Sequence, residues 1–533
     1  MAFVKPEYNQ IAPVKIMLSV GCLFDIPTGT YLDGIHGEKI LNGGIGALNG
    51  IVGVGNCFKS TITHYQSLTA AYRAHGQSSI ITYDTESNIH PWHLSELSVY
   101  ATGDDWIAQE RWSVTDRSLY EGDAWYDIFK DFMKAKKGDK SLLVDTKYRD
   151  RNGKPLKTII PTLAEVDSFS KFSTSDVVKM QDDNKLGEKG ANTMHMRQGL
   201  QKSRFLDETP SYATGSSTYI MLTAHFGEKI EMDPYAPTLK KLQYVKQGQA
   251  IKGVPSNFTF FMNTCWQALS AKPLVDGDRA PLYPRSSDDR TSKDTDLNEV
   301  DLLQLRCKSG PSGNEIKIIV SQTEGVLPSL SEFHYLKTNK RFGLPGNDRE
   351  YQCALLPGVT LTRTNIRNNL SANKRLARAI NICSELLQMI KMWYPKKKLE
   401  ERLVCTPEEL YTGIQAQGYD WEMILGMTRG YTSFDPEHPL LELSTMDLLR
   451  MRIGEYHPYW LEDDKKIIKK AYLGCVKELI AANQPLLGKS AADVKVGAEL
   501  AIKGKASKTV KDSPIVKDDI DAQLEAELKK SLA

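Results

Sequence analysis

The sequence predicts an α/β protein built on a mostly parallel, twisted sheet. Short apolar segments alternate with helical segments over about the first 340 residues, which is the pattern of parallel β-α-β units. A glycine-rich loop follows one of the strands and polar residues follow others, as in folds that place their chemistry at the strand ends. An Asn-Gly pair within 141–157 predicts a hairpin. The expected strands are 15–24, 48–54, 78–83, 156–166, 217–224, 259–262, 302–306 and 315–321, and the expected helices are 60–75, 122–136 and 194–203.

The composition is that of a globular protein with two or three domains. The 533 residues are 41% hydrophobic and 25% charged, enough for a substantial core. The net charge of +2 gives no overall basic field, so nucleic-acid binding would have to come from a local stripe or from loops. The eight cysteines contain no C-x-x-C pair, which argues against zinc and disulfide scaffolds. Because no signal peptide or long apolar run is present, we expect a cytoplasmic protein without a membrane span.

The character of the sequence changes near residue 340. We expect an N-terminal arm at 1–14, an α/β core at 15–340, a mainly helical domain at 345–485, and a linker with a charged tail at 488–533. Within the helical domain, Thr406 followed by Pro-Glu-Glu has the pattern of a capped helix start. Further helices are expected at 371–392 and 461–482.

Residues 53–61 read G-V-G-N-C-F-K-S-T, a phosphate-binding loop that departs once from the pattern G-x-x-x-x-G-K-[ST]. The glycines let the backbone wrap a phosphate, and the positive end of the following helix faces the same anion. We expect Lys59 to reach the β- and γ-phosphates and Ser60 to hold Mg²⁺. Phe58 replaces the second glycine, so its ring must point away from the phosphates, and a positive φ there has a steric cost. The alternative is a glycine-rich turn with a chance lysine. The residues expected to contact the nucleotide are Gly53, Val54, Gly55, Asn56, Cys57, Phe58, Lys59, Ser60 and Thr61.

Three further strands end in residues suited to nucleotide hydrolysis. Glu86 follows the second strand, where a carboxylate can orient and deprotonate the water that attacks the γ-phosphate. Asp167 follows the third strand, where a carboxylate binds Mg²⁺. His225 follows the fourth strand, where it can touch the γ-phosphate and report hydrolysis to the next loop.

Each of these residues has an alternative interpretation. Glu86 could cap a helix, and His225 could be an ordinary polar group with its hydrogen bonds satisfied. Asp145 is a rival for the Mg²⁺ role, although it opens the expected hairpin, which is why we prefer Asp167. The prediction therefore depends on the ordered set of strand ends rather than on any single residue.

Taken together, the segments GVGNCFKS, IITYDTE, EVDS and TAH resemble the ATPase core of RecA-type recombinases. They are most similar to the UvsX-type recombinases of large phages, which also carry Phe-Lys-Ser in the loop and a histidine at the sensor position. The segment RCKSGPSGNEIKIIVSQTEGVLPS (306–329) resembles the strand pair that closes the same core. The resemblance covers about residues 15–340; the insertion at 141–158, Pro161 and the long helical C-terminal region depart from it.

The resemblance implies a RecA-like P-loop ATPase core that binds ATP and Mg²⁺ between subunits. It gives the loop, Glu86 and Asp167 the roles described above. Arg306 and Lys308 match a basic pair that reaches into the neighbouring subunit's nucleotide site. Residues two apart on a strand share one face, so both could meet the same γ-phosphate across an interface. The alternative for this pair is a solvated basic edge.

The segments that follow Asp167 and His225 correspond to the family's DNA-binding loops, here 182–193 and 234–256. Basic and aromatic residues in the second segment suit single-stranded DNA, although an ordinary solvated loop would also contain them. The residues expected to contact DNA are Lys240, Lys241, Tyr244, Lys246 and Lys252.

The resemblance thus implies an ATP-dependent DNA recombinase, acting in the cytoplasm of a bacterium or a phage-infected cell. Such a protein is a DNA-stimulated ATPase that forms helical filaments on single-stranded DNA and promotes homologous pairing and strand exchange. Two alternatives stay open. One is a hexameric helicase on the same core, which would form closed rings. The other is a slowly hydrolysing nucleotide-binding regulator or assembly protein, which the relaxed loop with Phe58 permits.

Overall fold

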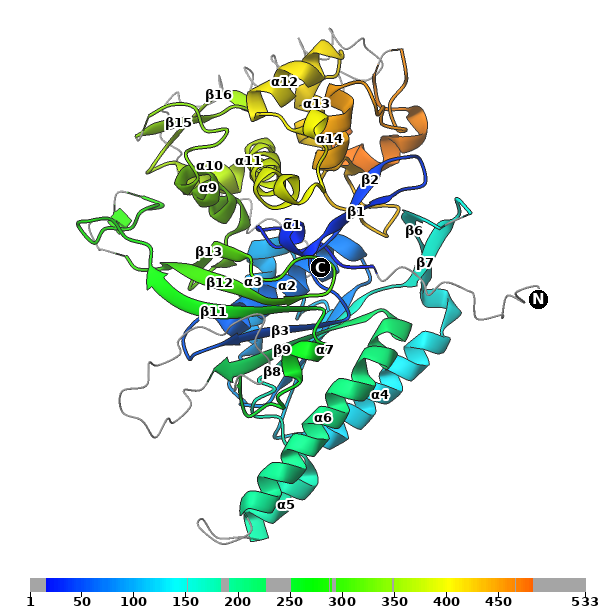
Figure 1. Cartoon of the computed structure of the whole chain (residues 1–533), viewed down its shortest axis with the longest axis vertical. Helices are drawn as coiled ribbons and strands as arrows, with labels where there is room; N and C mark the ends of the chain where they lie inside the picture. Colours follow the sequence, from blue (N-terminus) through cyan, green and yellow to red (C-terminus); the bar gives the residue numbers. More distant parts are fainter. Residues whose placement is uncertain are drawn as a thin grey trace, which may run out of the picture.

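The computed structural model describes residues 16–482, apart from 151, 184–190, 227–250, 287, 290–293, 348 and 465. It shows an α/β protein with one large mixed sheet, helices on both faces of that sheet and a further, largely helical region stacked at one end (Figure 1). The expected arm at 1–14 and the linker and tail at 488–533 lie outside the described residues. Among the residues described, no helix has the length and apolar character needed to cross a membrane.

The large sheet contains ten strands within the described chain, in the order β14-β13-β12-β11-β3-β9-β8-β4-β5, with β10 paired to β9. The run from β11 through β3, β9, β8 and β4 to β5 is parallel, whereas β12, β13 and β14 extend it antiparallel. Because the parallel strands share one direction, their carboxyl ends meet at one edge. The strands are β3 (Leu48–Gly53), β4 (Ser79–Asp84), β5 (Trp112–Asp116), β8 (Thr162–Asp167), β9 (Thr218–Phe226), β10 (Ile251–Lys252), β11 (Thr264–Pro273), β12 (Leu297–Cys307), β13 (Glu315–Ser321) and β14 (Gly325–Val326).

Helices cover both faces of the sheet because successive strand residues point to opposite faces. Along β8, Leu163 packs into the core on one face, and Ala164 and Val166 pack into the core on the other. The first face is covered by α2 (Lys59–Ala74) and α3 (Pro91–Thr102), and the second by α4 (Gly122–Gly138) and α6 (Ala191–Ser216). Together with α5 (Ser175–Asp183), the pair α4 and α6 projects beyond the sheet (Figure 1).

Smaller elements complete this part of the chain. The hairpin expected within 141–157 is confirmed, since β6 and β7 pair antiparallel. The elements are α1 (Asp25–Thr28), β1 (Thr30–Asp33), β2 (Lys39–Asn42), β6 (Leu143–Arg149), β7 (Pro155–Ile159), α7 (Phe258–Phe261) and α9 (Pro328–Thr338).

Two expected strands differ from the structure through local chemistry. The strand expected at 156–166 is broken, because Pro161 has no amide hydrogen and separates β7 from β8. The strand expected at 15–24 is wrong: it forms only an isolated bridge at Leu18. The carboxylate of Asp25 accepts the amides of Val20 and Gly21, so these groups do not pair with a neighbouring strand.

A third expected strand, at 259–262, is also wrong, since it is the short helix α7. The aromatic run reads as strand-like, but the amide of Phe258 donates to the carbonyl of Pro255 and the amide of Phe260 to that of Asn257. These bonds coil the chain, and they bury Phe258 against the sheet. The strand itself follows as β11.

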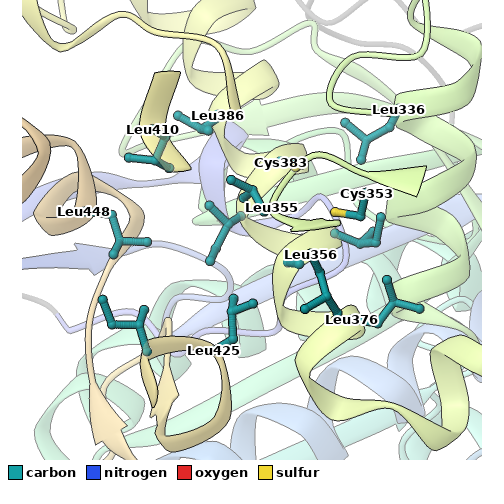
Figure 2. Close-up of a cluster of buried hydrophobic side chains, with 14 of the residues drawn as sticks. Leu336, Cys353, Leu355, Leu356, Leu376, Cys383, Leu386, Leu410, Leu425 and Leu448 are labelled. Carbon is teal, nitrogen blue, oxygen red and sulfur yellow. The ribbon is translucent and has the colours of Figure 1, made fainter. Parts of the chain in front are cut away.

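The region after β14 is largely helical, and its apolar core also includes residues of the sheet and of the elements before it, among them Ile26, Leu41, Leu297 and Ile319. Figure 2 shows leucines from four helices meeting there, with Leu386 on α11, Leu410 on α12, Leu425 on α13 and Leu448 on α14. The elements are β15 (Glu350–Cys353), β16 (Leu356–Thr362), α10 (Ile366–Ala372), α11 (Lys374–Gln388), α12 (Pro407–Ala416), α13 (Trp421–Met427), β17 (Thr428–Arg429), β18 (Leu441–Glu442), α14 (Thr445–Arg452) and α15 (Lys477–Ala482).

Capping side chains mark the starts of α11, α12, α13 and α14 in this region. The capping box at Thr406 is confirmed, since its side chain accepts the amide of Glu409 while the Glu409 carboxylate accepts the amide of Thr406. The helix expected at 371–392 is interrupted at Asn373, whose side chain caps α11. The helix expected at 461–482 is confirmed only in its later part: the early residues form turns, Lys470–Val476 form a 3₁₀ helix, and α15 follows.

Candidate functional site

β3 leads through the glycine-rich loop into α2 at the carboxyl edge of the sheet. α2 begins at Lys59, and the amides of its first turn have no acceptor within the helix. A side chain at Gly53 would place its Cβ 3.0 Å from the Cβ and the carbonyl oxygen of Ala268, so β3 and β11 approach closely at this strand end. Val54 and Asn56 are exposed, which leaves the outer side of the loop open to solvent. The loop therefore leads to first-turn amides that have no acceptor within the helix, at an accessible edge.

Phe58 keeps the backbone conformation that the replaced glycine would adopt. Its φ is 55° and its ψ is 27°, in the left-handed region that the sequence led us to consider costly for phenylalanine. This conformation costs a non-glycine residue about 1–2 kcal/mol. The ring of Phe58 packs against the apolar core between α2 and the sheet. The free energy gained by burying the ring therefore offsets part of the cost of the left-handed backbone conformation at Phe58.

Lys59 is buried at the base of the loop. Its Nζ donates a hydrogen bond of 2.7 Å to the carbonyl of Val54. Burial lowers the pKa of Lys59 below its ordinary value, and the negative charge of Asp167 partly opposes that shift. The loop thus holds one ammonium group close to the carboxylates at the neighbouring strand ends.

The turn after β4 is organised by Asp84, which is buried. Its carboxylate accepts the amides of Glu86, Asn88 and Ile89 at 2.9, 2.7 and 2.7 Å. The side chain of Glu86 remains 30% exposed. The turn therefore fixes the backbone of Glu86 while leaving its carboxylate accessible.

The ends of β4, β8 and β9 meet around that carboxylate. Glu86 Oε1 lies 3.1 Å from His225 Nε2 and accepts a hydrogen bond of 3.2 Å from Ser168 Oγ. Next to them, Asp167 Oδ1 accepts a hydrogen bond from Thr223 Oγ1. The structure thus brings a carboxylate–histidine contact and a second, oriented carboxylate to the edge that carries the glycine-rich loop.

A buried ion pair lies beneath this edge and joins α2 to the sheet. His64 Nδ1 is 2.9 Å from Glu165 Oε2, which also accepts a hydrogen bond of 2.7 Å from Thr82 Oγ1. Thr82 Oγ1 in turn accepts the indole N–H of Trp112 at 2.9 Å. The side chains of His64 and Glu165 are only 5% and 0% exposed. Glu165 lies two residues before Asp167 on β8, so both side chains are on the same face of the sheet. The network therefore fixes α2 on the face of the sheet to which Asp167 belongs.

The basic pair and the rival aspartate lie elsewhere. Asp145 is on the β6–β7 hairpin, exposed, and paired with Lys157 at 3.0 Å. Arg306 pairs with Cys265, and Cys265 pairs with Gly50, so Arg306 lies toward the amino edge of the parallel strands. Lys308 donates from Nζ to the carbonyl of Phe261 at 3.1 Å and lines a pocket of about 440 Å³ at that edge. The chain therefore does not bring Arg306 and Lys308 to its own glycine-rich loop.

Most of the expected DNA-contacting residues fall outside the described chain. Lys240, Lys241, Tyr244 and Lys246 belong to the segment 227–250. Lys252 is described: it is exposed on β10, paired with His225 of β9.

Several residues of the site were not singled out from the sequence. Thr223 and Ser168 orient Asp167 and Glu86, and Asp84 builds the turn. Thr223 had a usable signal, because it lies two residues before His225 and so shares its face of the strand. No signal in the sequence indicates the His64–Glu165 pair, because the two residues are 101 positions apart.

Comparison of the chain with protein-family models and with curated proteins finds no match.

Replacing His64 with Ala is expected to destabilise the protein by about 3–5 kcal/mol, because it leaves Glu165 buried without its ion-pair partner. Urea unfolding followed by circular dichroism measures this loss. The double change His64→Gln with Glu165→Gln removes both charges and should recover part of the stability. A single variant as stable as the wild type would show that the pair has no structural role.

The same pair predicts a pH dependence. Burial alone lowers the pKa of His64, but the Glu165 carboxylate outweighs it and raises the pKa above the ordinary 6.5. Burial alone raises the pKa of Glu165, but charged His64, together with the hydroxyl groups of Ser67 and Thr82, outweighs it and lowers the pKa below the ordinary 4.5. The His64 contribution is complete below pH 6.5 and is lost as pH rises through its raised pKa, and the Glu165 contribution is complete above pH 4.5 and is lost as pH falls. The stability difference between wild type and His64→Ala should therefore be greatest between pH 4.5 and 6.5.

Proposed function

We propose that this chain is an ATP-dependent DNA recombinase with a RecA-like P-loop core, which assembles into helical filaments on single-stranded DNA. The observation that supports this most directly is the meeting of the glycine-rich loop, Glu86, Asp167 and His225 at one sheet edge. That edge offers the groups that phosphoryl transfer to water requires: amides and a lysine for the phosphates, a base, and a carboxylate for a metal. The proposal that the protein forms filaments on single-stranded DNA and acts in recombination depends on the resemblance of its motifs to those of RecA-type recombinases.

The donor chemistry of the site fits ATP with Mg²⁺. Ser60, in the first turn of α2, carries a hydroxyl, and Asp167 supplies a carboxylate; these hard oxygen ligands are the kind that Mg²⁺ prefers. The Lys59 ammonium and the first-turn amides carry the positive charge that the β- and γ-phosphates attract. Bound Mg²⁺ would neutralise charge that develops on the phosphates.

Glu86 is proposed as the base that orients and deprotonates the attacking water. Its carboxylate is accessible and is held by Ser168 and His225. His225 is proposed as the group that senses the γ-phosphate, because its ring contacts Glu86 and its strand leads directly into the segment 227–250. Hydrolysis would change the contacts of Glu86 and His225 together.

Arg306 and Lys308 are proposed to act on the nucleotide of a second copy. Their place toward the amino edge separates them from the loop of their own chain. Arg306 is half-buried and Lys308 is exposed, so both side chains remain accessible in part to a group from outside the chain. A site shared between copies would make ATP binding and assembly depend on each other.

ATP turnover measured with and without single-stranded DNA tests this function, with the same samples imaged by negative-stain electron microscopy. Stimulated turnover together with helical filaments is the expected result. Stimulated turnover with closed rings would favour the hexameric helicase, which uses a shared site equally well. Stoichiometric ATP binding with negligible turnover in both conditions would favour the nucleotide-binding regulator and overturn the recombinase.

A further inference from the structure

Lys202 on α6 is a buried lysine whose partners are main-chain carbonyls. Its Nζ donates to the carbonyl of Ser170 at 2.8 Å and to that of Gly253 at 2.6 Å, and it lies 5.7 Å from the ring centre of Phe169. The residue is only 2% exposed. Burial of an ammonium group is costly unless its hydrogen bonds are satisfied, so the two carbonyls must be held where Nζ can reach both. Burial lowers the pKa of Lys202 to about 8, and the charge of Lys171 adds to that shift.

Ser170 connects these carbonyls to the nucleotide edge. Its Oγ accepts the amide of His225 at 2.8 Å and donates to the carbonyl of Lys252 at 2.8 Å. Gly253 has a φ of 68°, and a Cβ there would lie 2.7 Å from the carbonyl oxygen of Ser170. The approach is therefore too close for any other residue. We call Ser170, Lys202, His225 and Gly253 the junction.

Three functional segments connect to the junction through short stretches of chain. Ser168, two residues before Ser170, holds the carboxylate of Glu86. β9 and β10, which pair at His225 and Lys252, are the two ends of the segment 227–250. α6 begins at Ala191, immediately after the segment 184–190. Lys202 thus fastens α6, which begins within the expected DNA-binding segment 182–193, to Gly253, which lies within the other expected segment, 234–256, beside the proposed catalytic carboxylate.

We propose that Lys202 is a positioning residue that couples the nucleotide edge to both expected DNA-binding segments. The inference rests on the proposed function. A change in the contacts of Glu86 and His225 moves Ser170, because Ser168 and Ser170 belong to one short stretch of backbone and Ser170 is bonded to His225. Lys202 carries that movement to Gly253 and to α6, since one Nζ holds both carbonyls. Coupling of this kind is reciprocal: nucleotide tightens DNA binding by the same factor by which DNA tightens nucleotide binding.

Lys202→Met tests the inference because methionine keeps much of the apolar stem but has no donor. Turnover is measured with and without single-stranded DNA, and DNA affinity is measured by fluorescence anisotropy with and without a non-hydrolysable ATP analogue. We expect basal turnover and nucleotide-free DNA affinity within about 2-fold of wild type, and a loss of about 10-fold in both the stimulation and the nucleotide-induced gain in affinity, within the ~5–150-fold range of allosteric coupling. Lys130→Met is the matched control, since it removes a lysine bond between α4 and Glu208 of α6 away from the junction.

Ser170→Ala disrupts the junction at a different residue, and it provides the test if Lys202→Met does not fold. It removes the bonds to His225 and Lys252 and should show the same selective loss. Unchanged stimulation in a folded Lys202→Met, or in Ser170→Ala, overturns the inference, as does an equal loss of basal and stimulated turnover. If single-stranded DNA does not stimulate turnover of the wild-type protein, the proposed function is overturned instead. The wild-type measurement therefore distinguishes failure of the proposed function from failure of the inference about Lys202.

Discussion

Lys59→Ala is expected to lower ATP turnover by about 100-fold or more, with and without single-stranded DNA. Lys59 is the buried cation of the glycine-rich loop, and removal of one charge that stabilises a transition state costs about 10²–10³ in rate. Steady-state phosphate release at saturating ATP measures the effect. Nucleotide affinity should also weaken, because in the proposed site the same ammonium would contact the phosphates in the ground state.

Lys134→Ala is the control for that change. Lys134 is an exposed lysine on α4, paired only three residues away with Asp131, and its loss should leave turnover unchanged. Thermal unfolding of both variants separates a lost site from a lost fold. Full DNA-stimulated turnover in Lys59→Ala would show that the loop is not the nucleotide site.

Glu86→Gln is expected to lower turnover by about 10²–10⁴-fold while ATP binding is retained. The amide has nearly the shape of the carboxylate and can still accept from Ser168, but it cannot take a proton from water. Equilibrium binding of a fluorescent ATP analogue, together with single-turnover hydrolysis, distinguishes a loss of chemistry from a loss of binding. Filaments of this variant should therefore persist on DNA.

Glu96→Gln on α3 is the matched change for Glu86, since Glu96 is an exposed glutamate on the helix that follows the same turn. It should turn over ATP at the wild-type rate. If Glu86→Gln hydrolysed ATP normally, the base would have to be another residue.

The strand ends could be predicted from the sequence because their two signals, an apolar run and the polar residue that follows it, are both local. An apolar run followed by Glu86, Asp167 or His225 marks where a buried strand meets the sheet edge, and parallel strands bring those points to one edge. The prediction of a strand at 259–262 was wrong because a local signal can be ambiguous. The aromatic residues there suit a buried strand and a buried helical turn equally well.

Long-range features could not be predicted in this way. The junction at Lys202 depends on the packing of α6 against the ends of β8 and β10, which no spacing in the sequence records. The conformation of Phe58 depends on the apolar core that receives its ring. Arg306 and Lys308 were recognised as a pair, but only the strand order places them away from the loop of their own chain.

The measurement that tests the account most directly is a cryo-electron-microscopy structure of the protein with single-stranded DNA, Mg²⁺ and a non-hydrolysable ATP analogue. We expect a helical filament in which the nucleotide lies on Lys59 of one copy and faces Arg306 and Lys308 of the next. We also expect DNA against the segments that leave β9 and precede α6. A nucleotide bound away from the glycine-rich loop, or DNA on another face of an unassembled protein, would contradict it.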